Sequence, residues 1–187
     1  MISKSIRAGM FIALGCIIFL SAPNVLIGAL LFSLGLLCVG LTESYLYTGQ
    51  VHKLVEEDRK LIDLFWIFVG NLFGVALMAI PAIYLTELGA DARMIATTKM
   101  AQPILITFIQ SIWCGILMTM ATRKNTPKYV TIGCVFAFVL SGFNHSIADT
   151  FYYLAYGNIL ATVPRLLITA IGNLIGGLLP VLKLAPK

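Results

Sequence analysis

Six long apolar segments make up most of this chain and restrict the folds that it can adopt. They cover approximately residues 6–20, 25–39, 61–85, 103–121, 129–155 and 159–182. Of the 187 residues, 59% are hydrophobic and 11% are charged, which is more apolar surface than a water-soluble domain of this size can bury. The sequence therefore predicts an all-α integral membrane protein, with residues 1–187 forming a single transmembrane domain. We expect neither a separate soluble domain nor a cleavable signal peptide.

The basic residues predict how the chain is oriented in the bilayer. Most of the 13 Lys and Arg side chains fall at the two termini and in the alternate loops 51–60 and 123–128, and the intervening loops contain Arg93, Lys99 and Arg165. This bias predicts a multi-pass protein of the cytoplasmic (inner) membrane with both termini in the cytoplasm. No basic cluster lies on a soluble face, so we expect no nucleic-acid partner.

Two connecting segments and the four cysteines give no sign of a separate functional site. Residues 51–60 are amphipathic and charged, which favours an interfacial helix, and residues 87–98 form the longest outer loop. Each of the four cysteines lies alone in an apolar span without the spacing of a metal site. We therefore expect no metal and no cofactor.

Two polar interruptions occur at membrane depth. Residues 42–49 include Glu43 and Thr48, and residues 141–150 include Asn144, His145 and Asp149. Polar side chains and irregular backbone at this depth are tolerated where they face the bundle interior or line a cavity. Two simpler interpretations remain open, namely an early exit into the cytoplasmic loop for the first stretch and a polar knot between helices for the second.

A short repeat relates the two halves of the chain. Residues 70–74 read Gly-Asn-Leu-Phe-Gly, residues 172–176 read Gly-Asn-Leu-Ile-Gly, and the strings contain Asn71 and Asn173. The strings lie three spans apart, an odd number, so the halves must have opposite orientations. This pattern indicates an inverted repeat with half-repeats at about 1–88 and 99–187, in which helices two and five are broken and meet at the centre. The alternative is that the glycines only allow close helix packing.

The central side chains suit a small weak acid. A histidine exchanges protons near neutral pH, so a neutral His145 could hydrogen-bond an acid and a charged one could pair with its anion. Thr48 could orient the ring or contact the solute. A cation channel would need a ring of carboxylates, which these spans lack. We expect Asp149, Glu43, Asn71 and Asn173 to support this site.

These motifs together resemble the formate/nitrite transporter family, over residues 7 to about 182. Residues 142–149, Gly-Phe-Asn-His-Ser-Ile-Ala-Asp, are similar to the family signature Gly-Phe-Glu-His-Ser-Val-Ala-Asn. Residues 43–49 resemble its Glu-Leu-Phe-Thr-Gly loop, and the two Gly-Asn-Leu strings match its third and sixth spans. Lys99 matches a vestibule lysine.

The resemblance implies an aquaporin-like protomer of six transmembrane helices with its own pore, assembled as a homopentamer. Its function would be that of a channel or transporter for a small monovalent anion or its conjugate acid, with formate and nitrite first. The pore residues that it implies are Thr48, Asn144 and His145 at the centre, Leu36, Leu46 and Tyr47 at a cytoplasmic constriction, Phe32, Met118 and Phe138 at an outer constriction, and Lys99 in the vestibule. Without the resemblance, ordinary helix packing would be the preferred explanation for Phe32, Leu36, Met118 and Phe138.

A mechanism follows as a hypothesis. Lys99 draws the anion into the vestibule, and loss of hydration makes its charge costly. The anion then takes a proton, from water or through His145, and crosses the constrictions as the neutral acid.

Departures from the family pattern leave the substrate open. Asn144 replaces a frequent glutamate, Asp149 replaces asparagine, Gly115 replaces asparagine, and Tyr47 adds a hydroxyl to an apolar constriction. We expect Asp149 to be buried and either protonated or hydrogen-bonded, on one helical face with His145. Hydrosulfide, acetate and lactate remain alternatives, as does an aquaporin-like channel for a neutral solute.

An enzyme is the least favoured interpretation. The chain has no Gly-x-Ser-x-Gly or His-Glu-x-x-His motif. Its second histidine, His52, lies in the charged segment 51–60 rather than in a span. A purely structural membrane protein would not need polar breaks at paired positions.

Overall fold

The computed structural model describes residues 1–182, and all of the regular secondary structure within them is helical. Lys183 and Lys187, which contribute to the charge bias, lie outside the described residues. The helices are α1 (Ile2–Ser21), α2 (Val25–Leu41), α3 (Tyr47–Gln50), α4 (Lys53–Glu56), α5 (Leu61–Leu85), α6 (Leu88–Ala101), α7 (Ile104–Thr122), α8 (Lys128–Leu140), α9 (Ser146–Tyr156), α10 (Ile159–Leu178) and the 3₁₀ turn η1 (Leu179–Val181).

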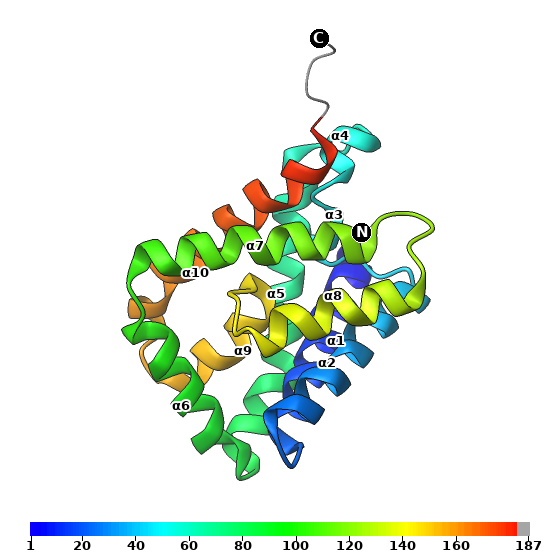
Figure 1. Cartoon of the computed structure of the whole chain (residues 1–187). Helices are drawn as coiled ribbons and strands as arrows, with labels where there is room; N and C mark the ends of the chain where they lie inside the picture. The colour runs from blue at the N-terminus through cyan, green and yellow to red at the C-terminus, as the bar shows by residue number, and fades with distance from the viewer. Residues whose placement is uncertain (183–187) are drawn as a thin grey trace.

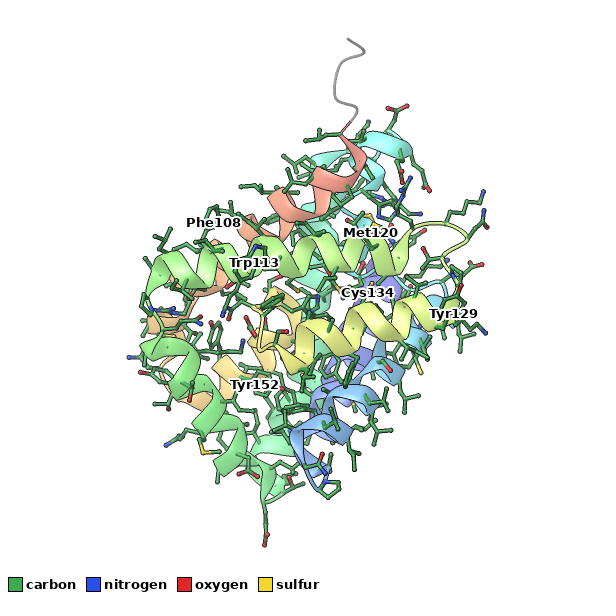
Figure 2. The ribbon with its side chains drawn as sticks, in the orientation of Figure 1. Phe108, Trp113, Met120, Tyr129, Cys134 and Tyr152 are labelled. Atoms are coloured by element: carbon green, nitrogen blue, oxygen red, sulfur yellow. The ribbon has the colours of Figure 1, made fainter. Side chains whose placement is uncertain are left out.

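Short helix α9 occupies the interior of the molecule. It packs against α1, α5, α6 and α10, while α1 pairs with α5 and α7 pairs with α10 (Figure 1). Its residue Tyr152 projects into the bundle and is 6% exposed (Figure 2). The polar residues of the second interruption are therefore held at the centre of the fold.

Four helical stretches of the described residues are long and apolar enough to cross a membrane. They are Ile2–Ser21, Leu61–Leu85, Ile104–Thr122 and Ile159–Val181. The helices α2 and α8 are also apolar but have only 17 and 13 residues. Each of these shorter helices leads directly into one of the polar interruptions.

Both interruptions break a helix in the same way. Helix α2 ends at Leu41 and α3 begins at Tyr47, while α8 ends at Leu140 and α9 begins at Ser146. Each connection turns at a positive φ, 50° at Glu43 and 69° at Gly142. Left-handed backbone suits Gly142 and is unusual for Glu43, so the first turn depends on the surrounding contacts.

The two repeated asparagines hold these breaks in place. The side-chain oxygen of Asn71 accepts the N–H of Tyr47 at 2.7 Å, and that of Asn173 accepts the N–H of Ser146 at 2.8 Å. Each amide nitrogen then donates to two backbone carbonyls, those of Ser5 and Tyr45 for Asn71 and those of Ser111 and Asn144 for Asn173. Backbone groups that a helix would have paired are thus satisfied without water.

The glycines of the repeated strings allow the supporting helices to touch. A Cβ atom on Gly74 would overlap the carbonyl oxygen of Ile6 in α1, and one on Gly176 would overlap the carbonyl oxygen of Ile112 in α7. Such close backbone contact is typical of small residues at membrane helix interfaces. The asparagine and the glycine of each string therefore have separate structural tasks.

The two connecting segments differ in helix content from what the sequence suggests. The helix expected within residues 51–60 is limited to the four-residue α4, which ends at Glu56, and the backbone then turns to a positive φ of 51° at Asp58. Residues 87–98, expected as an outer loop, lie almost entirely in α6. Alanines explain the second difference, because Ala92 and Ala96 are good helix formers and both are fully buried.

Candidate functional site

The two broken segments meet at a contact between His145 and Thr48. The imidazole Nε2 lies 2.8 Å from the Thr48 hydroxyl, and each residue is 1% exposed. Thr48 is in the first turn of α3, and His145 directly precedes α9. Residues 97 positions apart therefore form one buried polar pair, which the breaks in both helices make possible.

The second nitrogen of His145 determines which tautomer this contact needs. Its Nδ1 accepts the backbone N–H of Ala148 at 3.2 Å and so caps the N-terminus of α9. A backbone N–H can only donate, so Nδ1 carries no proton. The neutral ring then has its hydrogen on Nε2 and donates it to the Thr48 oxygen. The Thr48 hydroxyl hydrogen is left to be donated to a third group.

Aromatic rings cover one side of this pair. The Phe138 ring lies 5.4 Å from the His145 ring and 6.0 Å from that of Phe32, which it meets edge to face at 84°. Phe32, Phe138 and Met118 are 2%, 3% and 1% exposed. The polar contact is therefore next to a tightly packed aromatic pair from α2 and α8.

The residues expected at the cytoplasmic constriction are also buried. Leu36, Leu46 and Tyr47 are 3%, 1% and 7% exposed and belong to the main buried apolar cluster. The Tyr47 hydroxyl donates to the carbonyl oxygen of Ala170 in α10 at 3.0 Å. This contact accounts for the hydroxyl that departs from the family pattern, because the oxygen is used within the protein.

Lys99 is not a free cation. Its ammonium group lies 2.9 Å from the carboxylate of Asp149 and donates to the Asn144 side-chain oxygen at 2.9 Å. The side chain of Lys99 is 14% exposed and that of Asp149 is 2% exposed. Asp149 is thus buried as expected, but its cationic partner was not foreseen from the sequence, because Lys99 lies on α6 and spacing along α9 says nothing of that helix.

Sequence reasoning also missed two glutamines. The Asn144 amide nitrogen donates to Gln102 at 3.1 Å and to Gln110 at 2.9 Å, and Gln102 donates to Gln110 at 2.9 Å. The only sequence signal for this contact was the presence of two polar side chains near the start of the apolar segment 103–121. They join the N-terminal part of α7 to the polar centre.

Glu43 does not support the site with its side chain, which corrects the sequence-based expectation. The carboxylate is 84% exposed and lies 3.5 Å from the Lys4 ammonium group. The carboxylate points into solvent because its charge keeps its hydration there, which burial at the site would remove. Only the turned backbone of Glu43 contributes to the break between α2 and α3.

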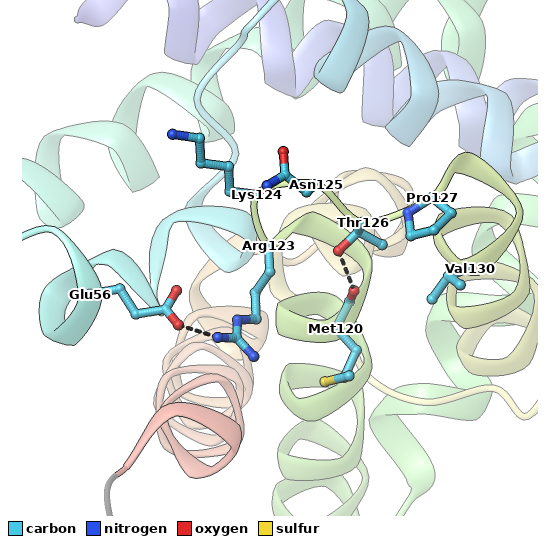
Figure 3. A pocket seen from close by; sticks show the side chains of 8 residues that line it. All are labelled: Glu56, Met120, Arg123, Lys124, Asn125, Thr126, Pro127 and Val130. Atoms are coloured by element: carbon cyan, nitrogen blue, oxygen red, sulfur yellow. Dashed lines mark hydrogen bonds and ion pairs between the residues drawn. The ribbon is translucent and has the colours of Figure 1, made fainter.

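A separate surface cavity of about 420 Å³ opens near the α7–α8 connection. Its lining includes Arg123, whose guanidinium lies 2.6 Å from the Glu56 carboxylate of α4 (Figure 3). Pro127 and Val130 line the same cavity. Neither His145 nor Thr48 lines this cavity, and we assign it no solute.

His52, next to this cavity, predicts acid sensitivity of the connecting segment. The residue is 2% exposed, and burial lowers its pKa although Glu56 lies 3.8 Å away. The folded state therefore prefers the neutral ring, and stability is lost as the pH falls below the ordinary histidine value of about 6.5. We expect hydrogen exchange in residues 51–60 to rise between pH 7.5 and 5.5 (about one unit either side of that value). The variant His52→Gln should lack this rise, and an equal rise in that variant would contradict the assignment.

The described residues 1–182 contain no group of three or more His, Cys, Asp or Glu side chains placed to hold a metal ion. The interactions seen at the site are hydrogen bonds and the Lys99–Asp149 charge pair.

Comparison with known proteins gives consistent matches. The sequence model described as formate/nitrite transporter matches residues 1–185. Proteins described as formate channel FocA from Escherichia coli strains K12 and O157:H7 are each 28% identical over 181 residues, covering 79% of this chain. The chain spans 62% of the length of these curated relatives.

Solved structures match over nearly the whole chain. One described as a pentameric formate channel with formate bound is 23% identical, with a TM-score of 0.78, and the match covers 95% of this chain and 92% of the other. One described as an FNT family ion channel is 22% identical, with a TM-score of 0.81, and the match covers 96% and 86%. At these identities the matches establish a shared fold.

Proposed function

The chain belongs to the formate/nitrite transporter family, and on that premise we propose that it is a channel for a small monovalent weak acid, formate or nitrite first, in the cytoplasmic membrane. The observation that carries the proposal is the buried His145–Thr48 contact, 2.8 Å long, beside the packed Phe32–Phe138 pair. A polar contact enclosed by apolar side chains suits a solute that hydrogen-bonds but crosses without charge.

We propose an inverted repeat for the architecture, with half-repeats at about 1–88 and 99–187 and six spans in which helices two and five are broken. The paired contacts support it: Asn71 and Asn173 satisfy corresponding groups at the two breaks, and Gly74 and Gly176 approach α1 and α7 in the same manner. Each protomer would carry its own pore in a homopentamer, with both termini in the cytoplasm.

The central pair would act as a fixed donor. His145 donates from Nε2 to Thr48, so the Thr48 hydroxyl can donate to an oxygen of the passing acid. Adding a proton to His145 Nδ1 would break the cap on α9. We therefore favour water in the vestibule, rather than the imidazole, as the source of the proton that neutralises the anion.

The apolar constrictions would exclude ions and water. Leu36, Leu46 and Tyr47 would close the cytoplasmic side, and Phe32, Met118 and Phe138 the outer side. Lys99 would meet the anion first with the third of its N–H groups, since two already contact Asn144 and Asp149.

Transport by purified protein in liposomes tests the proposal. Uptake of formate, nitrite, acetate, lactate, hydrosulfide and glycerol would be measured at several external pH values against protein-free liposomes. We expect formate or nitrite to be fastest, with uptake at fixed total concentration rising as the external pH falls. Preferred uptake of glycerol would support the neutral-solute alternative, and absence of any uptake would refute the channel.

The outer aromatic pair gives a prediction on selectivity. Phe138→Ala removes the edge contact with Phe32 and should raise acetate and lactate uptake relative to formate by about tenfold. This is the lower end of the discrimination that a tight apolar site achieves between solutes that differ by one methylene group. Phe73→Ala is the matched control, because Phe73 is 55% exposed on α5. Equal selectivity in both variants would show that Phe138 does not line the path.

A further inference from the structure

Charge and amide have exchanged places in this chain relative to the family signature. The signature has glutamate at position 144 and asparagine at position 149, whereas this chain has Asn144 and Asp149. Both side chains contact the Lys99 ammonium group at 2.9 Å. The signature and this chain thus each have one carboxylate at these two positions, and in this chain it lies beyond His145 on α9.

A chain of hydrogen bonds explains why position 144 carries an amide here. The Arg165 guanidinium can only donate, and it donates to the Thr107 hydroxyl. The Thr107 hydroxyl hydrogen has two acceptors in reach, the Gln102 oxygen at 3.2 Å and the Pro103 carbonyl oxygen at 3.5 Å, and the Gln102 oxygen is the nearer. The Gln102 nitrogen then donates to the Gln110 oxygen at 2.9 Å. Both glutamines consequently present oxygen atoms, as acceptors, toward residue 144.

Position 144 must therefore be a donor. Asn144 meets this requirement, since its amide nitrogen donates to the Gln102 and Gln110 oxygens and its own oxygen accepts from Lys99. An ionised glutamate has no hydrogen to donate and would face two acceptors. The counter-charge of Lys99 has to come from elsewhere, and Asp149 supplies it.

The contacts of Asp149 are those expected of a counter-charge to Lys99. Its Oδ1 lies 2.9 Å from Lys99, and within the described residues its Oδ2, although buried, has no hydrogen-bond partner. Two other cations of this region are used elsewhere: the Arg165 guanidinium donates to Thr107 and to the Met100 carbonyl oxygen, and that of Arg93 donates to the Ala155 carbonyl oxygen. Lys99 is thus the cation that Asp149 neutralises.

We propose that Asp149 is a positioning residue that neutralises Lys99 and so prevents the vestibule from trapping the permeating anion. The inference rests on the proposed function. A solute must bind well enough to enter and weakly enough to leave, and a buried lysine without a counter-charge would hold an anion too tightly. Paired with Asp149, Lys99 offers the anion a hydrogen bond without a net positive charge.

Kinetics of formate uptake test the proposal. Asp149→Asn should lower KM and maximal uptake together, KM by about tenfold, whereas a merely structural loss would not tighten binding. Asp149→Glu should stay close to wild type. The double variant Asn144→Glu/Asp149→Asn should not recover wild-type KM and maximal uptake, because the side chain at position 144 must donate hydrogen bonds to Gln102 and Gln110. The exposed α6 residue gives the control Asp91→Asn, which should behave as wild type. Unchanged kinetics in Asp149→Asn, or full recovery in the double variant, would overturn the proposal.

Thermal stability in detergent separates this proposal from the proposed function. Asp149→Asn should lower the melting temperature because it leaves Lys99 buried and unpaired, and Lys99→Gln/Asp149→Asn should recover part of that loss. This comparison is informative even if wild-type liposomes transport none of the acids, a result that would refute only the channel. If Lys99→Gln/Asp149→Asn is no more stable than Asp149→Asn, the pairing proposal fails.

Discussion

Replacing His145 with phenylalanine is expected to lower formate uptake by about 100-fold, a rise of about 2.7 kcal/mol in the barrier. The variant loses the Nε2 donor to Thr48 and places an apolar ring where the solute would need a hydrogen bond. The loss should hold across the pH range, because the proposed role is a fixed donor and not a titrating group. Uptake by the purified variant in liposomes is the measurement.

The control for this variant separates the cap from the contact. His145→Asn keeps a side-chain oxygen that can accept the Ala148 N–H at the start of α9, but its amide is too short to reach Thr48. It should therefore match wild type in thermal stability and still transport poorly, as should Thr48→Val. Normal uptake in either variant would remove the His145–Thr48 contact from the transport path.

Adding one methyl group at Gly74 should have the largest effect on folding. The Cβ of Gly74→Ala would overlap the Ile6 carbonyl oxygen, a backbone atom that cannot rotate away. We expect a loss of about 3 kcal/mol or more, seen as failure to recover folded protein after purification. Gly176→Ala should behave alike, since it meets the Ile112 carbonyl oxygen in the same way.

Helix α8 offers the matched control, because a Cβ on Gly133 would meet nothing within 4 Å. Gly133→Ala should leave the folded yield unchanged or improve it slightly, by up to about 1 kcal/mol from helix propensity alone. Equal yields of Gly74→Ala and Gly133→Ala would show that the close approach of α1 and α5 is not required.

Much of this arrangement could be anticipated from residue patterns. The Gly-Asn-Leu strings indicated related halves, and Asn71 and Asn173 were expected to support the polar centre. The structure supplies a partner for each asparagine as the first N–H after a helix break. Burial of Asp149 was likewise predictable, since a carboxylate at this depth is expensive when exposed to lipid.

Other features depended on contacts that spacing along one helix cannot encode. The Lys99–Asp149 pair joins α6 to α9 across 50 residues, and the hydrogen-bond chain from Arg165 to Asn144 links α10 through α7 to the break before α9. Glu43 was misassigned because its motif position suggested a role for the carboxylate, whereas the backbone alone takes part in the break. The tautomer of His145 needed the cap on α9, which is visible only in three dimensions.

A structure of the protein in lipid, determined at saturating formate, tests the central claim most directly. The account predicts one formate in each protomer within hydrogen-bond distance of the Thr48 hydroxyl, on a path that passes Phe138 and Leu46. Formate bound on a different route through the protomer, with the His145–Thr48 pair sealed off from it, would contradict the account.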